Sequence, residues 1–191
     1  EELDLKNKYL APSFIDGHVH IESSMVGPGQ FAKAIVPRGV TTIIADPHEI
    51  ANVTGLAGIK YILDSSEDLP LDVYIMLPSS VPSTAFENAG AILEAKDLEN
   101  LKDHPRVLGL GEMMNYPGVI NADEDVVHKL ETFKDMVIDG HGPLIKDKDL
   151  NAYVAAGIET EHECSSLEEM KERLRLGMYI HIREGSAARN L

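Results

Sequence analysis

Short apolar runs alternate with longer amphipathic stretches along the whole chain. The runs rich in Val, Ile, Leu or Met predict seven buried strands, at residues 13–19, 41–45, 72–77, 106–110, 136–138, 158–161 and 178–182. The stretches between them predict helices at residues 29–36, 55–64, 91–102, 124–135, 148–155 and 167–176. This alternation favours an α/β fold with a parallel sheet, either doubly wound or closed into a barrel.

Polar residues and glycines mark the ends of several predicted helices. Side chains suited to capping a helix N-terminus precede four of them, at Thr54, Asp123, Asp147 and Ser165. At the last of these the register could differ by one residue, because Ser166 and Glu169 also form a capping pattern. Glycines that can adopt a left-handed conformation follow three helices, at Gly39, Gly157 and Gly177.

The motif content separates the two kinds of parallel fold. The chain has neither a Gly-x-Gly-x-x-Gly run after its first strand nor a Gly-x-x-x-x-Gly-Lys-Ser/Thr run, so a nucleotide-binding open sheet loses support. A complete (β/α)8 barrel needs about 250 residues, and this chain has 191. We therefore predict an incomplete TIM-like barrel of about seven of the eight βα units.

Charge and cysteine content exclude several classes of protein. The 32 acidic residues outnumber the 17 basic ones, and the resulting field repels phosphate backbones, so we expect no nucleic-acid partner. No apolar run approaches the ~20 residues of a membrane span, so we expect no membrane association. The single cysteine, Cys164, rules out an internal disulfide framework and favours a reducing cytoplasm.

Metal-binding residue types collect where the predicted strands end. His18 and His20 are two positions apart on an extended strand, so both imidazoles reach toward one point. Glu112 follows the fourth strand. Six of the eight histidines lie at or near strand ends: His18, His20, His48, His141, His162 and His181. One such histidine is more often a hydrogen-bonded core or surface residue, but the recurrence predicts a metal site at the carboxyl edge of the sheet.

The ligand types limit which metals could bind and which reactions they could support. Imidazole and carboxylate ligands without thiolates suit Zn, Mn or Fe(II). Even four of these histidines, together with Glu112, are more ligands than one ion needs. Two ions ~4 Å apart would use them all. A hydroxide bridging two cations is a strong nucleophile near neutral pH, because each cation lowers the pKa of the bound water. The pattern therefore favours hydrolysis at an electrophilic carbon.

Longer runs of sequence resemble a known family. Residues 12–20 (PSFIDGHVH) resemble the first barrel strand of the amidohydrolase superfamily. Many members carry a carboxylated lysine on strand four, where this chain has Glu112. Glu112 in place of that lysine is one feature that resembles the adenine deaminase family of bacteria and archaea. The other features are the runs at residues 20–25 (HIESSM), 46–53 (DPHEIANV) and 183–188 (REGSAA). The resemblance extends from residue ~9 to the end of the chain.

The resemblance implies a set of roles and a reaction. His18 and His20 would bind one metal, His141 and His162 a second, and Glu112 would bridge both. The cofactor would be a binuclear divalent centre, with Mn or Fe(II) favoured over Zn. A metal-bound hydroxide would convert adenine, a small purine base, to hypoxanthine and ammonia. Residues 1–9 would be a remnant of a flanking β segment, and residues 10–191 a truncated barrel.

Five further residues are weaker candidates for substrate contact. Glu184 and Ser186 follow the seventh strand, and their alternative role is to cap a helix over residues 186–190. Glu22, His48 and Glu49 follow the first two strands, and the alternative for them is an ordinary hydrogen-bonded cluster.

Two other functions stay open. One is a different amidohydrolase, acting on a cyclic amide or another amino-heterocycle. The other is a metal-binding module without catalytic activity, because the family's proton-shuttle aspartate lies on strand eight, which this chain lacks. An incomplete barrel also leaves two sheet edges unpaired, so we expect a homo-oligomer.

Overall fold

The computed structural model describes residues 2–84, 86–185 and 189–191. Five strands form one parallel sheet in sequence order: β1 (Phe14–Val19), β2 (Val40–Ala45), β3 (Asp72–Leu77), β4 (Val107–Met113) and β5 (Val137–Gly140). Two shorter strands, β6 (Thr160–Glu161) and β7 (Tyr179–Ile180), pair in parallel as a second sheet. All seven strands found in the described part of the chain overlap the seven predicted ones.

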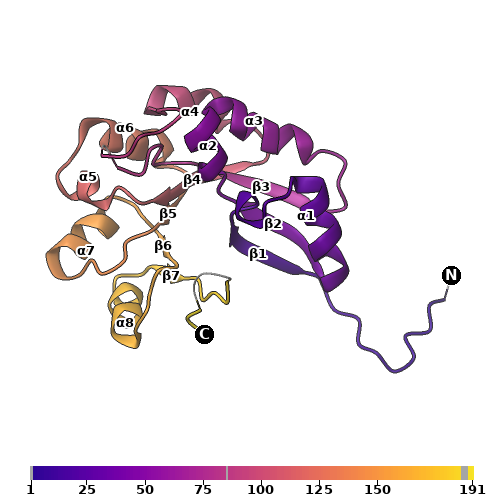
Figure 1. Cartoon of the computed structure of the whole chain (residues 1–191). Coiled ribbons are helices and arrows are strands. Elements are labelled where there is room, and N and C mark those ends of the chain that lie inside the picture. Colours follow the sequence, from indigo (N-terminus) through magenta and orange to yellow (C-terminus); the bar gives the residue numbers. More distant parts are fainter. Residues whose placement is uncertain (1, 85, 186–188) are drawn as a thin grey trace.

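The two sheets lie side by side and together form one curled wall of strands (Figure 1). The amide of Glu159 donates to the carbonyl of Ile138 over 3.0 Å, which places β6 beside β5. The strands therefore follow one another in sequence order from β1 to β7, as in a barrel that is not closed. This arrangement confirms the prediction of an incomplete TIM-like barrel.

Eight α-helices in the described residues lie on the outer side of this wall (Figure 1). They are α1 (Pro28–Ile35), α2 (His48–Thr54), α3 (Leu56–Ser65), α4 (Ala95–Lys102), α5 (Tyr116–Ile120), α6 (Glu124–Phe133), α7 (Asp147–Ala155) and α8 (Leu167–Arg175). The buried core joins helix residues such as Ile59 and Phe133 to strand residues such as Ile75 and Leu110.

The predicted helix boundaries are partly correct. Asp123 caps α6 by accepting from the amide of Val126, as predicted. Gly39, Gly157 and Gly177 adopt φ angles of +93°, +96° and +90°, as expected of glycines that end helical turns.

Three predicted caps were wrong, each for a local reason. The cap of α8 is Ser166 rather than Ser165, because Ser166 and Glu169 form the reciprocal capping box. Lys146 occupies the cap position of α7, so Asp147 lies inside the helix. Thr54 is the last residue of α2, and Gly55, with φ +63°, separates α2 from α3.

Two helices were missed by the sequence pattern, and α4 was predicted to begin too early. α2 begins directly after Pro47 in a polar run that was assigned to a strand end, and α5 is a single short helix that starts beside a proline. α4 begins at Ala95 instead of residue 91, because a capping box of Glu94 and Asp97 sets its start.

Residues 2–13 contain no helix or strand and run away from the body of the molecule (Figure 1), so the proposed division at residue 9 stays a prediction. Ser186 and most of the predicted helix at residues 186–190 lie outside the described residues. Among the residues that are described, no helix combines the length and apolar character needed to cross a bilayer.

Candidate metal centre

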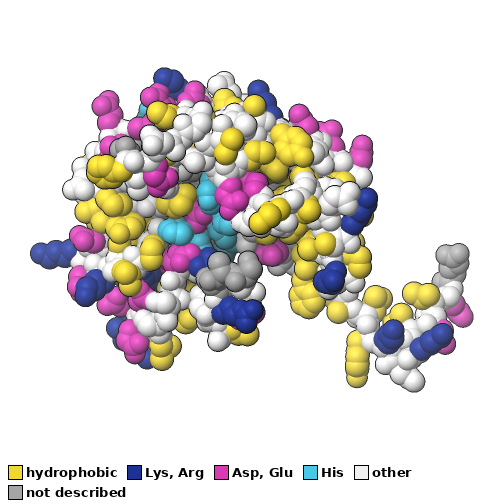
Figure 2. Space-filling view, in the orientation of Figure 1, with side chains coloured by type: hydrophobic (Ala, Val, Ile, Leu, Met, Phe, Trp, Pro, Cys, Tyr) yellow, Lys and Arg dark blue, Asp and Glu magenta, His cyan; other side chains and the backbone are white. Residues whose placement is uncertain are grey.

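Five predicted ligands converge at the carboxyl ends of the strands. His18 is in β1 and His20 just beyond it, Glu112 is in β4, His141 follows β5, and His162 follows β6. We call these five residues the His–Glu cluster. Figure 2 shows histidine and acidic side chains gathered in a hollow near the middle of the visible face. Residues distant in sequence are thus brought together where parallel α/β folds place their ligand sites.

Glu112 lies at the middle of the cluster and is 2% exposed. Its Oε2 atom is 2.6 Å from His141 Nδ1, 2.9 Å from His162 Nε2 and 4.0 Å from His18 Nε2. Its Oε1 atom is 3.4 Å from His20 Nε2. Two groups of potential ligands therefore share this one carboxylate: His18 and His20 with Glu112, and His141 and His162 with Glu112.

A backbone carbonyl fixes the tautomer of His20. His20 Nδ1 lies 2.8 Å from the carbonyl oxygen of Asp46, and because a carbonyl only accepts, Nδ1 must donate. In the neutral ring, Nε2 then carries a lone pair that faces Oε1 of Glu112. Orientation of a metal-binding histidine through its second ring nitrogen is common in metal sites.

The protonation states follow from burial and from the neighbouring charges. Burial, with the nearby His162 ring, lowers the pKa of His18 to about 2, so His18 is neutral and can act as a ligand. Burial alone would raise the pKa of Glu112, but hydrogen bonds from His141 and His162 outweigh it and hold this pKa well below the usual range. The pKa of His141 is raised, because its hydrogen bond to Glu112 outweighs its burial.

The donor set fits a divalent cation. When the His20 ring is neutral, its Nε2 and Glu112 Oε1 are both electron-pair donors at 3.4 Å, an arrangement that repels without a cation and is stabilised by one. The nitrogen and carboxylate donors of the cluster suit Zn, Mn or Fe(II). The chain's one cysteine, Cys164, belongs to none of the potential metal-binding groups found in the described residues.

Asp46 supports the cluster in a way that the sequence pattern did not predict. Its Oδ2 atom accepts from the amide of Glu112 over 2.8 Å, while its carbonyl binds His20. Gly111 allows this approach, because a Cβ at that position would overlap the Asp46 carboxylate. The sequence signal was Asp46 at a strand end beside His48, although a turn role explained that position equally well.

The weaker candidates at the ends of β1 and β2 lie beside the cluster. His48 Nδ1 is 3.2 Å from Glu112 Oε1 and 3.5 Å from Asp46 Oδ1, which makes a third potential metal-binding group. Burial lowers the pKa of His48, but the carboxylates around it raise this pKa to about 9 overall. Glu22 accepts from the amide of Ile50, and burial raises its pKa. Glu49 accepts from the Ser23 hydroxyl over 2.6 Å.

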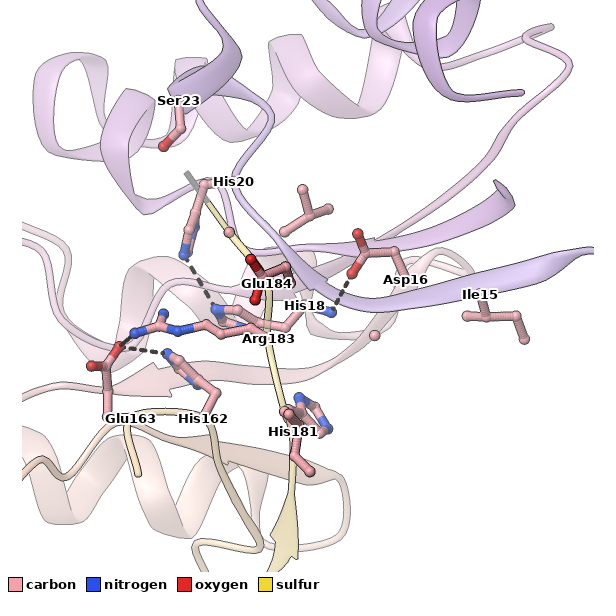
Figure 3. Close-up of a pocket in the computed structure, with 14 residues that line it drawn as sticks. Ile15, Asp16, His18, His20, Ser23, His162, Glu163, His181, Arg183 and Glu184 are labelled. Atoms are coloured by element: carbon pink, nitrogen blue, oxygen red, sulfur yellow. Dashed lines mark hydrogen bonds and ion pairs between the residues drawn. The ribbon is translucent and has the colours of Figure 1, made fainter. Parts of the chain in front are cut away.

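A cavity of about 830 Å³ opens beside the cluster, between β1 and the segment after β7. His18, His20, His162 and His181 line it together with Glu184 (Figure 3). Its size is in the range of small-molecule sites, and its wall contains imidazoles from both the first and the last strands. Glu184 therefore lies where a substrate contact is expected, whereas Ser186 is outside the described residues.

Glu163 and Arg183 close one side of this cavity. Glu163 Oε1 is 3.6 Å from His162 Nε2 and 3.8 Å from His141 Nδ1, and Arg183 donates to the same oxygen (Figure 3). The sequence pattern did not single out either residue as a neighbour of the cluster. Charge would not have revealed them, because Glu and Arg are common at solvated strand ends.

The family follows from comparison with known proteins. Residues 9–190 match the amidohydrolase family. The chain belongs to the amidohydrolase family. This finding agrees with the curled parallel strands and with the histidines at their carboxyl ends.

Curated relatives within this family are similar over the whole chain. The chain is 60% identical to an adenine deaminase of Clostridium acetobutylicum over 192 aligned residues, which cover all of the chain and 34% of that relative. It is 57% identical to adenine deaminase 2 of Carboxydothermus hydrogenoformans, with 98% of the chain and 33% of the relative covered. It is 58% identical to the adenine deaminase of Nitratidesulfovibrio vulgaris (strain DP4), with 99% of the chain and 33% of the relative covered. The chain thus spans about a third of the length of these relatives.

A solved structure supports the fold alone. The crystal structure of a Xaa-Pro dipeptidase with methionine bound in its active site superposes with a TM-score of 0.52 over 88% of this chain and 52% of that one. The sequence identity is 14%, so the likeness carries no argument about activity.

Proposed function

We propose that this chain is the metal-binding part of an adenine deaminase, which converts adenine and water to hypoxanthine and ammonia. The observation that carries the proposal is the 57–60% identity, over almost the entire chain, to the three adenine deaminases named above. The position of Glu112 at the middle of the His–Glu cluster supports it, because this glutamate distinguished the resemblance from other amidohydrolases.

The proposed cofactor is a pair of divalent cations, Mn or Fe(II) in preference to Zn. His18 and His20 would hold one, His141 and His162 the other, and Glu112 would bind both. Two of the three three-residue groups that share Glu112 consist of these histidine pairs, which supports this assignment. When bound, such cations lower the pKa of a coordinated water and so supply a nucleophile near neutral pH.

The chain's own residues would bind and orient a purine base. The cavity between β1 and the segment after β7 is large enough for adenine, and Glu184 on its wall can accept from an amino or ring N–H group. His48, with its raised pKa, would hold a proton at Nδ1 that faces Glu112 and Asp46. Glu22, Glu49 and Ser186 remain proposed substrate contacts.

Ammonia release tests the proposal directly. The protein, expressed at the full length that its gene encodes and loaded with Mn, is offered adenine, guanine, cytosine and a cyclic amide such as dihydrouracil. We expect ammonia from adenine alone, and the loss of each substrate is followed as well, because ring opening of a cyclic amide releases no ammonia. A folded, metal-loaded protein that turns over another of these compounds but not adenine would instead be a different amidohydrolase. Metal binding without turnover of any of them would leave the non-catalytic alternative.

A further inference from the structure

A buried ion pair joins helix α8 to the strand that precedes His162. Glu161, the last residue of β6, is fully buried, and Arg173 of α8 is 1% exposed. Arg173 Nε lies 3.3 Å from Glu161 Oε2. Charges this far from water are costly unless all of their polar atoms are hydrogen-bonded. The other partners of the pair therefore indicate what it does.

The Glu161 carboxylate binds backbone groups in two loops of the His–Glu cluster. Its Oε1 atom accepts from the amides of His162 and Glu163 over 2.9 Å and 2.8 Å. Its Oε2 atom accepts from the amide of Gly142 over 3.0 Å. Gly142 directly follows His141, so one carboxylate holds the backbone next to both histidines.

Arg173 holds the loop after β5 from the helix side. One of its terminal nitrogens donates to the carbonyls of Gly142 and Ile145 over 2.6 Å and 3.2 Å. The other donates to the carbonyl of Glu169 in its own helix over 3.2 Å. The planar guanidinium supplies these bonds and the one to Glu161 at once, which the compact ammonium of a lysine cannot do.

We propose that Glu161 and Arg173, here named the β6–α8 clamp, are positioning residues for the metal centre. The clamp sets the distance between His141 Nδ1 and His162 Nε2, which is 3.3 Å in this structure, by fixing the backbone that carries each ring. Neither clamp residue is itself a ligand in this proposal. The inference rests on the proposed function, because it requires that His141 and His162 share a cation.

Glu161→Gln is the first test. The amide group keeps the shape of the side chain, but its NH2 replaces one of two oxygens that both accept from N–H donors, so it faces donors in either orientation. Arg173→Lys is the conservative second variant. Asp125→Asn is the matched control, since Asp125 also binds a buried cation, Lys129, over 2.8 Å and accepts from the amide of Ala95, but belongs to none of the groups around Glu112.

Mn(II) alone is the probe, added to the full-length protein after removal of metal. Equilibrium dialysis gives the number and affinity of bound ions, and electron paramagnetic resonance distinguishes a coupled pair from an isolated ion. We expect wild type and Asp125→Asn to bind two coupled ions. Folded Glu161→Gln should bind the second ion at least about tenfold more weakly, with the spectrum of an isolated ion, and Arg173→Lys should be intermediate.

The outcomes separate the two proposals. Failure of the wild type to bind Mn(II) would count against the proposed function. Equal binding by the wild type and both clamp variants would overturn the clamp alone. A purely structural role would lower the thermal stability of Glu161→Gln and Asp125→Asn alike and leave Mn(II) binding by the folded proteins unchanged. If Glu161→Gln does not fold, the binding by Arg173→Lys decides.

Discussion

Glu112 lies within 4.0 Å of all four histidines of the His–Glu cluster. Loss of a residue that only orients a metal ligand weakens metal binding by about 10- to 100-fold. We expect Glu112→Gln to weaken metal binding by more than this, because the negative charge that the four histidines share is removed. Metal content after dialysis against a buffered metal measures the effect. Glu99→Gln, on the exposed side of α4, is the control and should bind metal as the wild type does. Equal metal content in both variants would contradict the ligand set.

Asp139 gives a pH-dependent prediction at the same scale. It is buried and accepts from Thr160 Oγ1 over 2.9 Å, and burial raises its pKa from 3.8 to about 6. Between these values the unfolded chain loses the proton while the folded chain keeps it, so stability falls as pH rises. Asn does not titrate, so the stability of Asp139→Asn should not fall in this way. The free energy of unfolding of the variant, relative to that of the wild type, should increase by up to about 3 kcal/mol from pH 4 to pH 7.

Urea unfolding of the metal-free proteins at several pH values measures this difference. A stability difference that stays constant across the range would show that Asp139 has an ordinary pKa in the folded chain.

Sequence reasoning located some of these residues better than others. The strand-end histidines and Glu112 could be predicted because their side-chain types are typical of metal sites and their spacing follows the strands. The contacts of Asp46 and Glu161 could not, because both carboxylates act on backbone amides from distant strands. Such contacts leave no residue pattern in a single sequence.

At the scale of elements, α8 offers a test of its N-terminus. Ser166 and Glu169 form a capping box there, and the Ser166 hydroxyl accepts from the amide of Glu169. Ser166→Ala should lower the free energy of unfolding by about 1 kcal/mol, because an orphan amide loses its partner. Denaturant unfolding provides the measurement. Lys171→Ala, at an exposed position of the same helix, should change stability by less than about 0.5 kcal/mol. An equal loss in both would argue against the capping role.

The elements also show where the hydrophobic pattern is a good guide. The predicted strand at residues 72–77 matches β3 in full, because its apolar residues are bounded by polar punctuation. α2 was missed because His48 and Glu49 read as the end of a strand, although they begin a helix. β6 and β7 each contain two residues and are shorter than their apolar runs, since strand length depends on the neighbouring strand as well as on the run.

For the whole molecule, the exposed ends of the curled wall predict self-association. Phe14 and Ile15 of β1 and Tyr179 of β7 are 71%, 67% and 71% exposed, which is unusual for large apolar residues in strands. We expect the 191-residue chain to associate in a concentration-dependent way in sedimentation velocity. Phe14→Lys should shift it toward the monomer. A monomer at every concentration for the unmodified chain would contradict the predicted homo-oligomer.

The overall architecture was predictable because alternation of strands and helices constrains a parallel fold strongly. How far the wall curls was not, because no sequence pattern marks the register irregularities between β1 and β2, β3 and β4, and β4 and β5. The position of His181, whose ring centre is 6.5 Å from that of His18, reflects this curvature.

The parts of the His–Glu cluster leave the ribosome at widely separated times, because they come from β1, β4, β5 and β6. His18 and His20 emerge early, whereas His162 is made only after five further strands, β2 to β6. An ion that meets the growing polypeptide first finds two imidazoles and no carboxylate of the set. Secure capture must therefore wait until Glu112, His141 and His162 have also been synthesised, which couples metal acquisition to the folding of β4, β5 and β6 against β1.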